Sequence, residues 1–109
     1  MATAKNNVST FGEQLRTLRE KSSLSLRDVA SEIGIDTSLL AKIERNERQP
    51  TKDQIKQVAS YFHIDEKKLI MESVSDMIAY KIIDEEVDIA TLKVAEQKVE
   101  YLKSTAKTK

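Results

Sequence analysis

The segment IGIDTSLLAKIERNERQPT, residues 33–51, decides the fold of this chain. It opens with a turn signal at Gly34, continues through about two and a half helical turns and leaves on Pro50, so it predicts a short helix with defined ends. A helix this short cannot form a core alone. Other helices must complete the core, which leaves the outward side chains of this helix available for a function.

The outward face of this helix carries no acidic side chain. On a wheel of about 100° per residue, Leu39, Leu40 and Ile43 share one side, which we expect to face the core. The opposite arc carries two hydroxyls, one alanine and two cations, namely Thr37, Ser38, Ala41, Lys42 and Arg45. Such a face donates hydrogen bonds, permits close approach and tolerates phosphates, so it suits the major groove of DNA. A face exposed only to solvent would give the same wheel, and both interpretations stay open at this point.

Three capping boxes predict where neighbouring helices begin. The boxes are Thr10 with Glu13, Ser25 with Asp28, and Thr51 with Gln54. The first box predicts a helix over about 11–21, and the second predicts a helix that ends at Gly34 in a left-handed conformation. A tight turn joins this second helix to the one that starts at Asp36, which is the spacing of a helix-turn-helix. A plain helical hairpin would give the same spacing.

The C-terminal part of the chain is expected to add two more helices. Asp65 caps the first, which carries apolar residues through Ile82 on a surface too wide for one interface. The acidic cluster that follows suits the positive end of a second helix, over about 85–103. Residues 79–83, AYKII, could instead form a short strand. Residues 104–109 lack an apolar anchor, so we expect them to be a frayed, basic tail.

The composition fits one domain with an appendage. The chain has 109 residues, 39% of them apolar, and no cysteine, which excludes disulfides and thiolate chemistry. No apolar run is long enough to cross a bilayer, and the start of the chain lacks the apolar segment of a secretory signal, so a cytoplasmic protein without membrane contact is expected. Residues 1–63 carry 10 basic and 8 acidic side chains and residues 64–109 carry 8 and 10, so a basic surface exists only as a local patch.

Residues 11–70 resemble the Xre/Cro-repressor family of helix-turn-helix DNA-binding domains. The resemblance rests on LSLRDVASEIGIDTSLLAKIERNERQPT, with Ala30 in the first helix of the motif, Gly34 in its turn, the IER segment at 43–45 and the closing Pro50. It implies an all-α fold.

The resemblance also implies an order of parts along the chain. We expect a five-helix lambda-repressor-like helix-turn-helix domain over 9–70, with an additional C-terminal helix. Residues 71–103 would then form a helical dimerisation extension, and residues 1–8 and 104–109 flexible termini.

Roles for the side chains of the motif follow from the same resemblance. The base-reading positions correspond to Thr37, Ser38, Ala41 and Lys42, and the positions that contact the DNA backbone to Arg27, Arg45, Asn46 and Arg48. Lys42 could donate to O6 and N7 of guanine, whereas the two hydroxyls discriminate weakly because each both donates and accepts. Phosphate contacts set the register without reading sequence.

Two positions depart from the family pattern. Leu26 stands where many relatives carry a glutamine that braces the DNA backbone, so this contact must be missing or replaced, for instance by Arg27. Asn46 stands where the family usually has glycine. Asparagine tolerates the left-handed conformation, so it can end the helix in the same way, and its amide could reach a phosphate.

Two other residues have structural interpretations. In the family, the glutamate that corresponds to Glu44 pairs with an arginine of the first helix, here Arg19, and we expect a structural ion pair. His63 is the only histidine, and with no cysteine beside it no metal site is expected. The sequence shows no catalytic constellation, so neither enzymatic activity nor a cofactor is expected.

Dimerisation is expected because one small domain reads only a few base pairs. The predicted interface is Ile70, Val74, Met77, Ile78, Val94 and Tyr101, although the last helix could instead cap the monomer core. The leading hypothesis is a sequence-specific transcriptional regulator, a repressor or autoregulator that binds double-stranded DNA as a homodimer on a palindromic operator. The alternative is an antitoxin or a restriction-modification controller whose C-terminal helices bind a protein partner.

Overall fold

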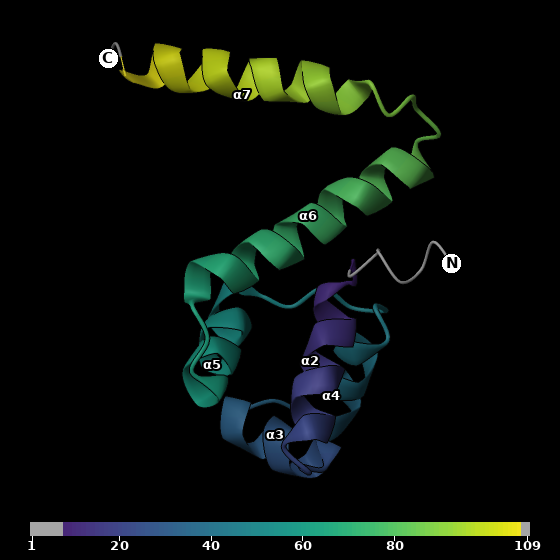
Figure 1. Ribbon diagram of the computed structural model, residues 1–109, viewed down its shortest axis with the longest axis vertical. Coiled ribbons are helices and arrows are strands. Elements are labelled where there is room, and N and C mark those ends of the chain that lie inside the picture. The colour runs from purple at the N-terminus through teal and green to yellow at the C-terminus, as the bar shows by residue number, and fades with distance from the viewer. Residues whose placement is uncertain (1–7, 108–109) are drawn as a thin grey trace. The chain divides into compact units, whose positions relative to one another are not determined.

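The computed structural model describes residues 8–107, which form six helices and no strand (Figure 1). The helices are α2 (Phe11–Lys21), α3 (Leu26–Ile33), α4 (Thr37–Glu44), α5 (Lys52–Phe62), α6 (Glu66–Asp84) and α7 (Thr91–Lys107). The all-α prediction is confirmed. The alternative of a short strand over 79–83 is wrong, because this segment lies within α6.

All three capping boxes are formed. Thr10, Ser25 and Thr51 each accept a hydrogen bond from the backbone N–H three residues later, at 3.1, 3.0 and 3.1 Å. The side chain of that later residue in turn accepts a hydrogen bond from the backbone N–H of the capping residue, at 3.0, 3.0 and 2.9 Å. Each box therefore satisfies two backbone donors that a helix start leaves without intrahelical partners.

The chain divides into two compact units, with the division inside α6 between Met77 and Ile78. In the first unit, α2 packs against α4, and α3 packs against both α4 and α5. The apolar stripes of these four helices and one residue of α6 form one buried core, which consists of Phe11, Leu15, Val29, Ala30, Ile33, Leu40, Ile43, Ile55, Val58, Ala59 and Leu69. This core packs against the buried side of α4 and fixes the position of that helix.

The contact between α2 and α4 depends on Gly12. A Cβ at this position would collide with the backbone carbonyl oxygen of Ile43 and lie 2.9 Å from that of Glu44. Only glycine therefore allows the two helices to approach this closely.

The first part of α6 belongs to the first unit. Leu69 and Ser73 are buried, and the side chains of Glu72 and Asp76 accept hydrogen bonds from Gln14 and Phe11 of α2, both at 2.8 Å. The first compact unit thus includes the part of α6 up to Met77.

The second unit corrects the predicted start of the last helix. The acidic cluster after α6 does not begin a helix, and α7 starts only at Thr91. Glu86 takes a left-handed φ of 54°, and its N–H bonds to Ile83 O at 3.1 Å, which terminates α6. Asp88 then accepts a hydrogen bond from Ala90 N at 2.8 Å, so this acid sits in the turn that leads into α7.

The end of the last helix also differs from the expectation. α7 continues to Lys107, beyond the predicted end at 103, so residues 104–107 are helical rather than a frayed tail. Residues 1–7 and 108–109, expected to be flexible, lie outside the described residues. No described helix combines the length and the apolar content that a membrane span requires.

Candidate DNA-binding interface

The helix-turn-helix is formed by α3, the turn at Gly34 and α4. Gly34 takes a left-handed conformation, with φ of 75° and ψ of 36°, and Ile35 N donates to Ala30 O at 3.0 Å. Ala30 itself is buried in the core. The turn thereby directs α4 across the end of α3, as the sequence spacing predicts.

α4 presents the expected side chains outward. Thr37, Ser38 and Lys42 are exposed and Ala41 is partly exposed, whereas Leu40 and Ile43 on the opposite side are buried in the core. The four candidate base-reading residues therefore share one accessible face of a helix whose back is fixed by packing. Asp36 precedes this helix but makes no side-chain capping bond.

Asn46 ends α4 in the left-handed conformation expected of it. Its φ is 65°, and Glu47 N donates to Lys42 O at 2.8 Å, which closes the last turn. The Asn46 side chain is partly buried, and its amide oxygen lies against Gly12 of α2. The amide therefore packs beside α2 and does not extend fully into solvent.

Three candidate phosphate-binding arginines, Arg27, Arg45 and Arg48, are exposed. Arg45 differs from the other two in that Glu47 holds its guanidinium through two hydrogen bonds, Nε to Oε2 at 2.9 Å and Nη2 to Oε1 at 3.1 Å. These bonds raise the pKa of Arg45 and lower the pKa of Glu47. The sequence did not lead to a prediction of this carboxylate, although the Arg-x-Glu spacing of residues 45–47 could have revealed it.

Leu26 explains one departure from the family pattern. Its side chain is partly buried and packs against the hydrophobic core. It contributes apolar area where relatives use a polar brace, and the exposed Arg27 is its neighbour on the surface.

Glu44, the one acid of α4, is turned away from the exposed face. Its side chain is 4% exposed and forms a two-bonded ion pair with Arg19 of α2, Nε to Oε2 at 2.7 Å and Nη2 to Oε1 at 3.0 Å. Arg19 also donates to Leu24 O at 3.0 Å, and the hydrogen bonds to Glu44 raise the pKa of its guanidinium. The pair joins the end of α4 to α2 and keeps this negative charge away from the exposed face of α4.

Among residues 8–107, no group of three histidine, cysteine or acidic side chains is placed to hold an ion. His63 is exposed and ends α5 with a left-handed φ of 57°, a structural position.

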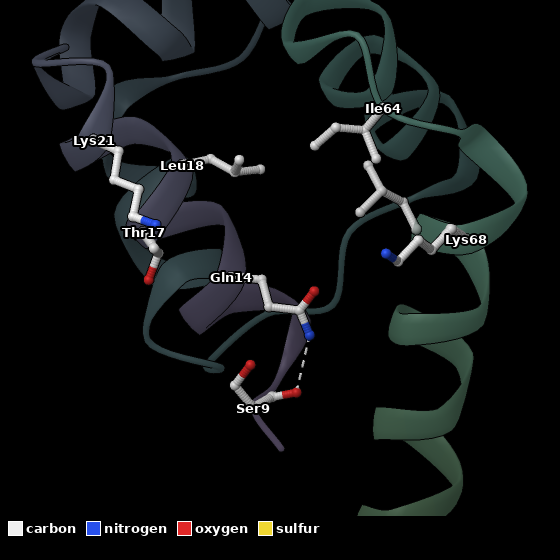
Figure 2. A pocket seen from close by; sticks show the side chains of 8 residues that line it. Ser9, Gln14, Thr17, Leu18, Lys21, Ile64 and Lys68 are labelled. Carbon is white, nitrogen blue, oxygen red and sulfur yellow. Dashed lines mark hydrogen bonds between the residues drawn. The ribbon is translucent and has the colours of Figure 1, made fainter. Parts of the chain in front are cut away.

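A groove of about 290 Å³ lies between α2 and the α5–α6 turn (Figure 2). Leu18 and Ile64 face each other across it, Lys68 lies at its edge, and Gln14 bonds to Ser9 O at 3.1 Å. None of the candidate base-reading residues lines this groove.

The fold and the exposed α4 face define a helix-turn-helix protein, and comparisons with known proteins agree. The family model described as "Helix-turn-helix domain" matches residues 12–73. The chain belongs to the Xre/Cro-like family of helix-turn-helix DNA-binding transcriptional regulators.

Solved structures share this fold. The restriction-modification controller protein C.AhdI from Aeromonas hydrophila is 32% identical, with 54% of this chain and 89% of that chain covered and a TM-score of 0.51. The biofilm regulator SinR in complex with DNA is 24% identical, with 56% and 98% covered and a TM-score of 0.51. The complex of SinR with SinI gives 20% identity, 87% and 99% covered and a TM-score of 0.52. No curated protein matches the chain.

Proposed function

We propose that this chain is a sequence-specific repressor or autoregulator that binds a palindromic operator as a homodimer, with α4 as the reading helix. The observation that carries the proposal is the accessible, acid-free face of α4, on which Thr37, Ser38 and Lys42 stand free of the core. Hydroxyls at the start of a helix, with an ammonium group about one turn further along the same face, are suited to base edges in the major groove.

The affinity for DNA would come from a small set of cations around this face. The net charge of the chain is zero, so attraction to phosphates depends on the exposed Arg27, Arg45 and Arg48 rather than on bulk charge. Each phosphate contact releases counterions, which makes binding weaken steeply with salt. The burial of Glu44 removes the one acid of α4 from the surface that would meet the phosphates.

The proposed homodimer would use apolar side chains that the described residues leave uncovered. Val74, Met77 and Ile78 are exposed on α6, and Val94 and Tyr101 on α7. Ile70, which is predicted from the sequence to lie in the same interface, is partly buried against the core and is less available. Two copies related by a twofold axis would read two half-sites about 34 Å apart.

The direct test is selection of bound duplexes from a random pool, followed by a mobility-shift titration at several salt concentrations. The proposal expects an enriched inverted repeat and an affinity that falls steeply with salt. Retention of all sequences alike, or no retention at low salt, would contradict it.

A second candidate function is control of a restriction-modification operon. The similarity to C.AhdI favours it, since that protein is a controller of this kind. An antitoxin role, with a protein partner on the C-terminal helices, would show as a complex that co-purifies from the native host. In both alternatives α4 remains the DNA-reading element. They differ from the leading proposal in the genes that are controlled and, for the antitoxin, in the protein partner.

A further inference from the structure

α7 carries an apolar stripe that differs from the pair Val94 and Tyr101. Leu92, Ala95, Val99, Leu102 and Ala106 follow one another at spacings of three, four, three and four residues. This is the a and d pattern of a coiled coil, with Leu92, Val99 and Ala106 at a. At about 100° per residue, Val94 and Tyr101 lie on roughly the opposite side of the helix. We call the five-residue stripe the α7 seam.

The α7 seam is uncovered in the single chain. Leu92, Val99 and Leu102 are 40%, 52% and 61% exposed, and Ala95 and Ala106 are exposed as well. A helix of 17 residues gains little stability in water from its own hydrogen bonds, so most of its stability must come from packing of an apolar face. The seam therefore requires a partner.

We propose that the α7 seam pairs in antiparallel orientation with the α7 seam of a second copy of this chain. This inference rests on the homodimer of the proposed function, and within that homodimer it places the α7 contact on the seam instead of on Val94 and Tyr101. The spacing fits a second copy because one seam supplies both a and d residues, so an antiparallel pair places Val99 beside Leu102 of the partner subunit twice, about one twofold axis. Ala95 then faces Ala106 of the partner subunit, which allows close approach at both ends.

The charges that flank the seam select the orientation. Glu96 and Lys103 occupy the e positions, and Lys98 occupies a g position. In the antiparallel register, e positions face each other, so Glu96 meets Lys103 of the partner subunit on both sides of the axis. In a parallel pair, g faces the e position five residues later, so Lys98 would meet Lys103 of the partner subunit. The antiparallel pair gains two attractions where the parallel pair has two repulsions.

The test is charge reversal in the full chain, with the dimer dissociation constant measured by sedimentation equilibrium. Lys103→Glu and Glu96→Lys each replace two attractive pairs by two repulsive ones, and each is expected to weaken the dimer about tenfold. The double variant Glu96→Lys with Lys103→Glu restores opposite charges and is expected to return to within about threefold of the parent.

Matched controls are available on the outer face of the same helix. Lys93→Glu and Glu100→Lys make the same chemical changes away from the seam. They also create the same like-charge neighbours three residues apart within the helix, so they correct for effects on α7 itself. Both controls are expected to dimerise like the parent, and circular dichroism verifies that helix content is equal.

The outcomes separate this inference from the proposed function. A tighter dimer for Lys103→Glu would indicate the parallel pair, in which Lys98 meets a glutamate, and would overturn the proposal. Single reversals that behave like their controls, or a parent that stays monomeric, would overturn it as well. Binding to a duplex with a single half-site is measured in parallel. If that binding persists while the reversal pattern fails, only the α7 pairing is wrong; if it is absent while the pattern holds, only the DNA-binding proposal is wrong.

Discussion

Asp76 of α6 caps α2 from a distance of 65 residues in sequence: its Oδ2 accepts a hydrogen bond from the backbone N–H of Phe11 at 2.8 Å. Phe11 is the first residue of α2, where backbone donors have no partner within the helix. Thr10 satisfies the N–H of Glu13, so the helix start receives one acceptor from its own cap and a second from α6. The part of α6 that belongs to the first unit is thereby fixed to the helix that also supports α4.

Loss of this remote cap should destabilise the first unit. We expect Asp76→Ala to lower the free energy of unfolding by about 1 kcal/mol, because a partly buried N–H loses its acceptor. Asp76→Asn keeps an acceptor oxygen and should retain most of the stability. Urea denaturation followed by circular dichroism measures both, and equal losses for the two variants would show that the hydrogen bond is not the cause.

Asp76 should also give stability a pH dependence. Burial raises the pKa of its carboxyl above the ordinary value of 3.8, and the charges of Glu72 and Glu13 add to the rise. Between 3.8 and the raised pKa, the folded state binds more protons than the unfolded state, so the free energy of unfolding falls as pH rises through that window. Denaturation over this range should show the decline in the parent relative to Asp76→Asn. A difference that stays constant with pH would contradict the assignment.

The buried pair of Arg19 and Glu44 should contribute far more to the free energy of unfolding than an exposed ion pair within α2. Glu44→Gln or Arg19→Ala leaves a buried group without its counter-charge and is expected to cost about 3–5 kcal/mol. Arg16 and Glu20, at 3.0 Å, are the matched control because their side chains are 61% and 55% exposed. Arg16→Ala should cost less than about 1 kcal/mol. Similar losses for Arg16→Ala and Arg19→Ala in chemical denaturation would refute this account of Arg19.

Lys42 should carry sequence preference. Lys42→Ala removes the one long donor among the candidate base-reading residues, so it should lower discrimination between operator and altered operators by about 1–3 kcal/mol. Stability should be unchanged, since Lys42 is exposed. Competition mobility shifts with single-base operator variants measure this. Equal weakening on all sequences would instead indicate that Lys42 contacts the DNA backbone.

Glu47 should compete with phosphate for Arg45. Because the two side chains hold each other through two hydrogen bonds, Glu47→Gln should free the guanidinium and tighten binding to all sequences alike. Arg45→Ala should weaken all sequences alike and reduce the slope of log K against log salt by about 1. A salt titration of DNA binding measures both the affinity and this slope. Glu20→Gln is the control, because it breaks an ion pair within α2.

Local signals predicted the first unit well. The three capping boxes, the left-handed residues Gly34 and Asn46, and the inward side of α4 all follow from short stretches of sequence, because each depends on neighbours within about one helical turn. The Arg19–Glu44 pair spans two helices and came from the family resemblance rather than from spacing.

The features that sequence missed depend on contacts that no local pattern shows. The cap from Asp76 joins residues far apart in the chain, and the close approach at Gly12 depends on how α2 crosses α4. The turn before α7 was misplaced because an acidic cluster favours a helix start in general, whereas here Glu86 takes a left-handed conformation and the helix begins later. The roles assigned to the exposed side chains of α4 remain predictions.

The separation of the two sides of α4 has an evolutionary consequence. Thr37, Ser38 and Lys42 are exposed, so exchanging them should change stability by no more than about 0.5 kcal/mol, whereas Leu40 and Ile43 behind them are held by the core. After gene duplication, one copy can therefore drift to a new set of target promoters through a few surface substitutions while its scaffold stays intact. Regulatory circuits can diversify in this way without a new fold.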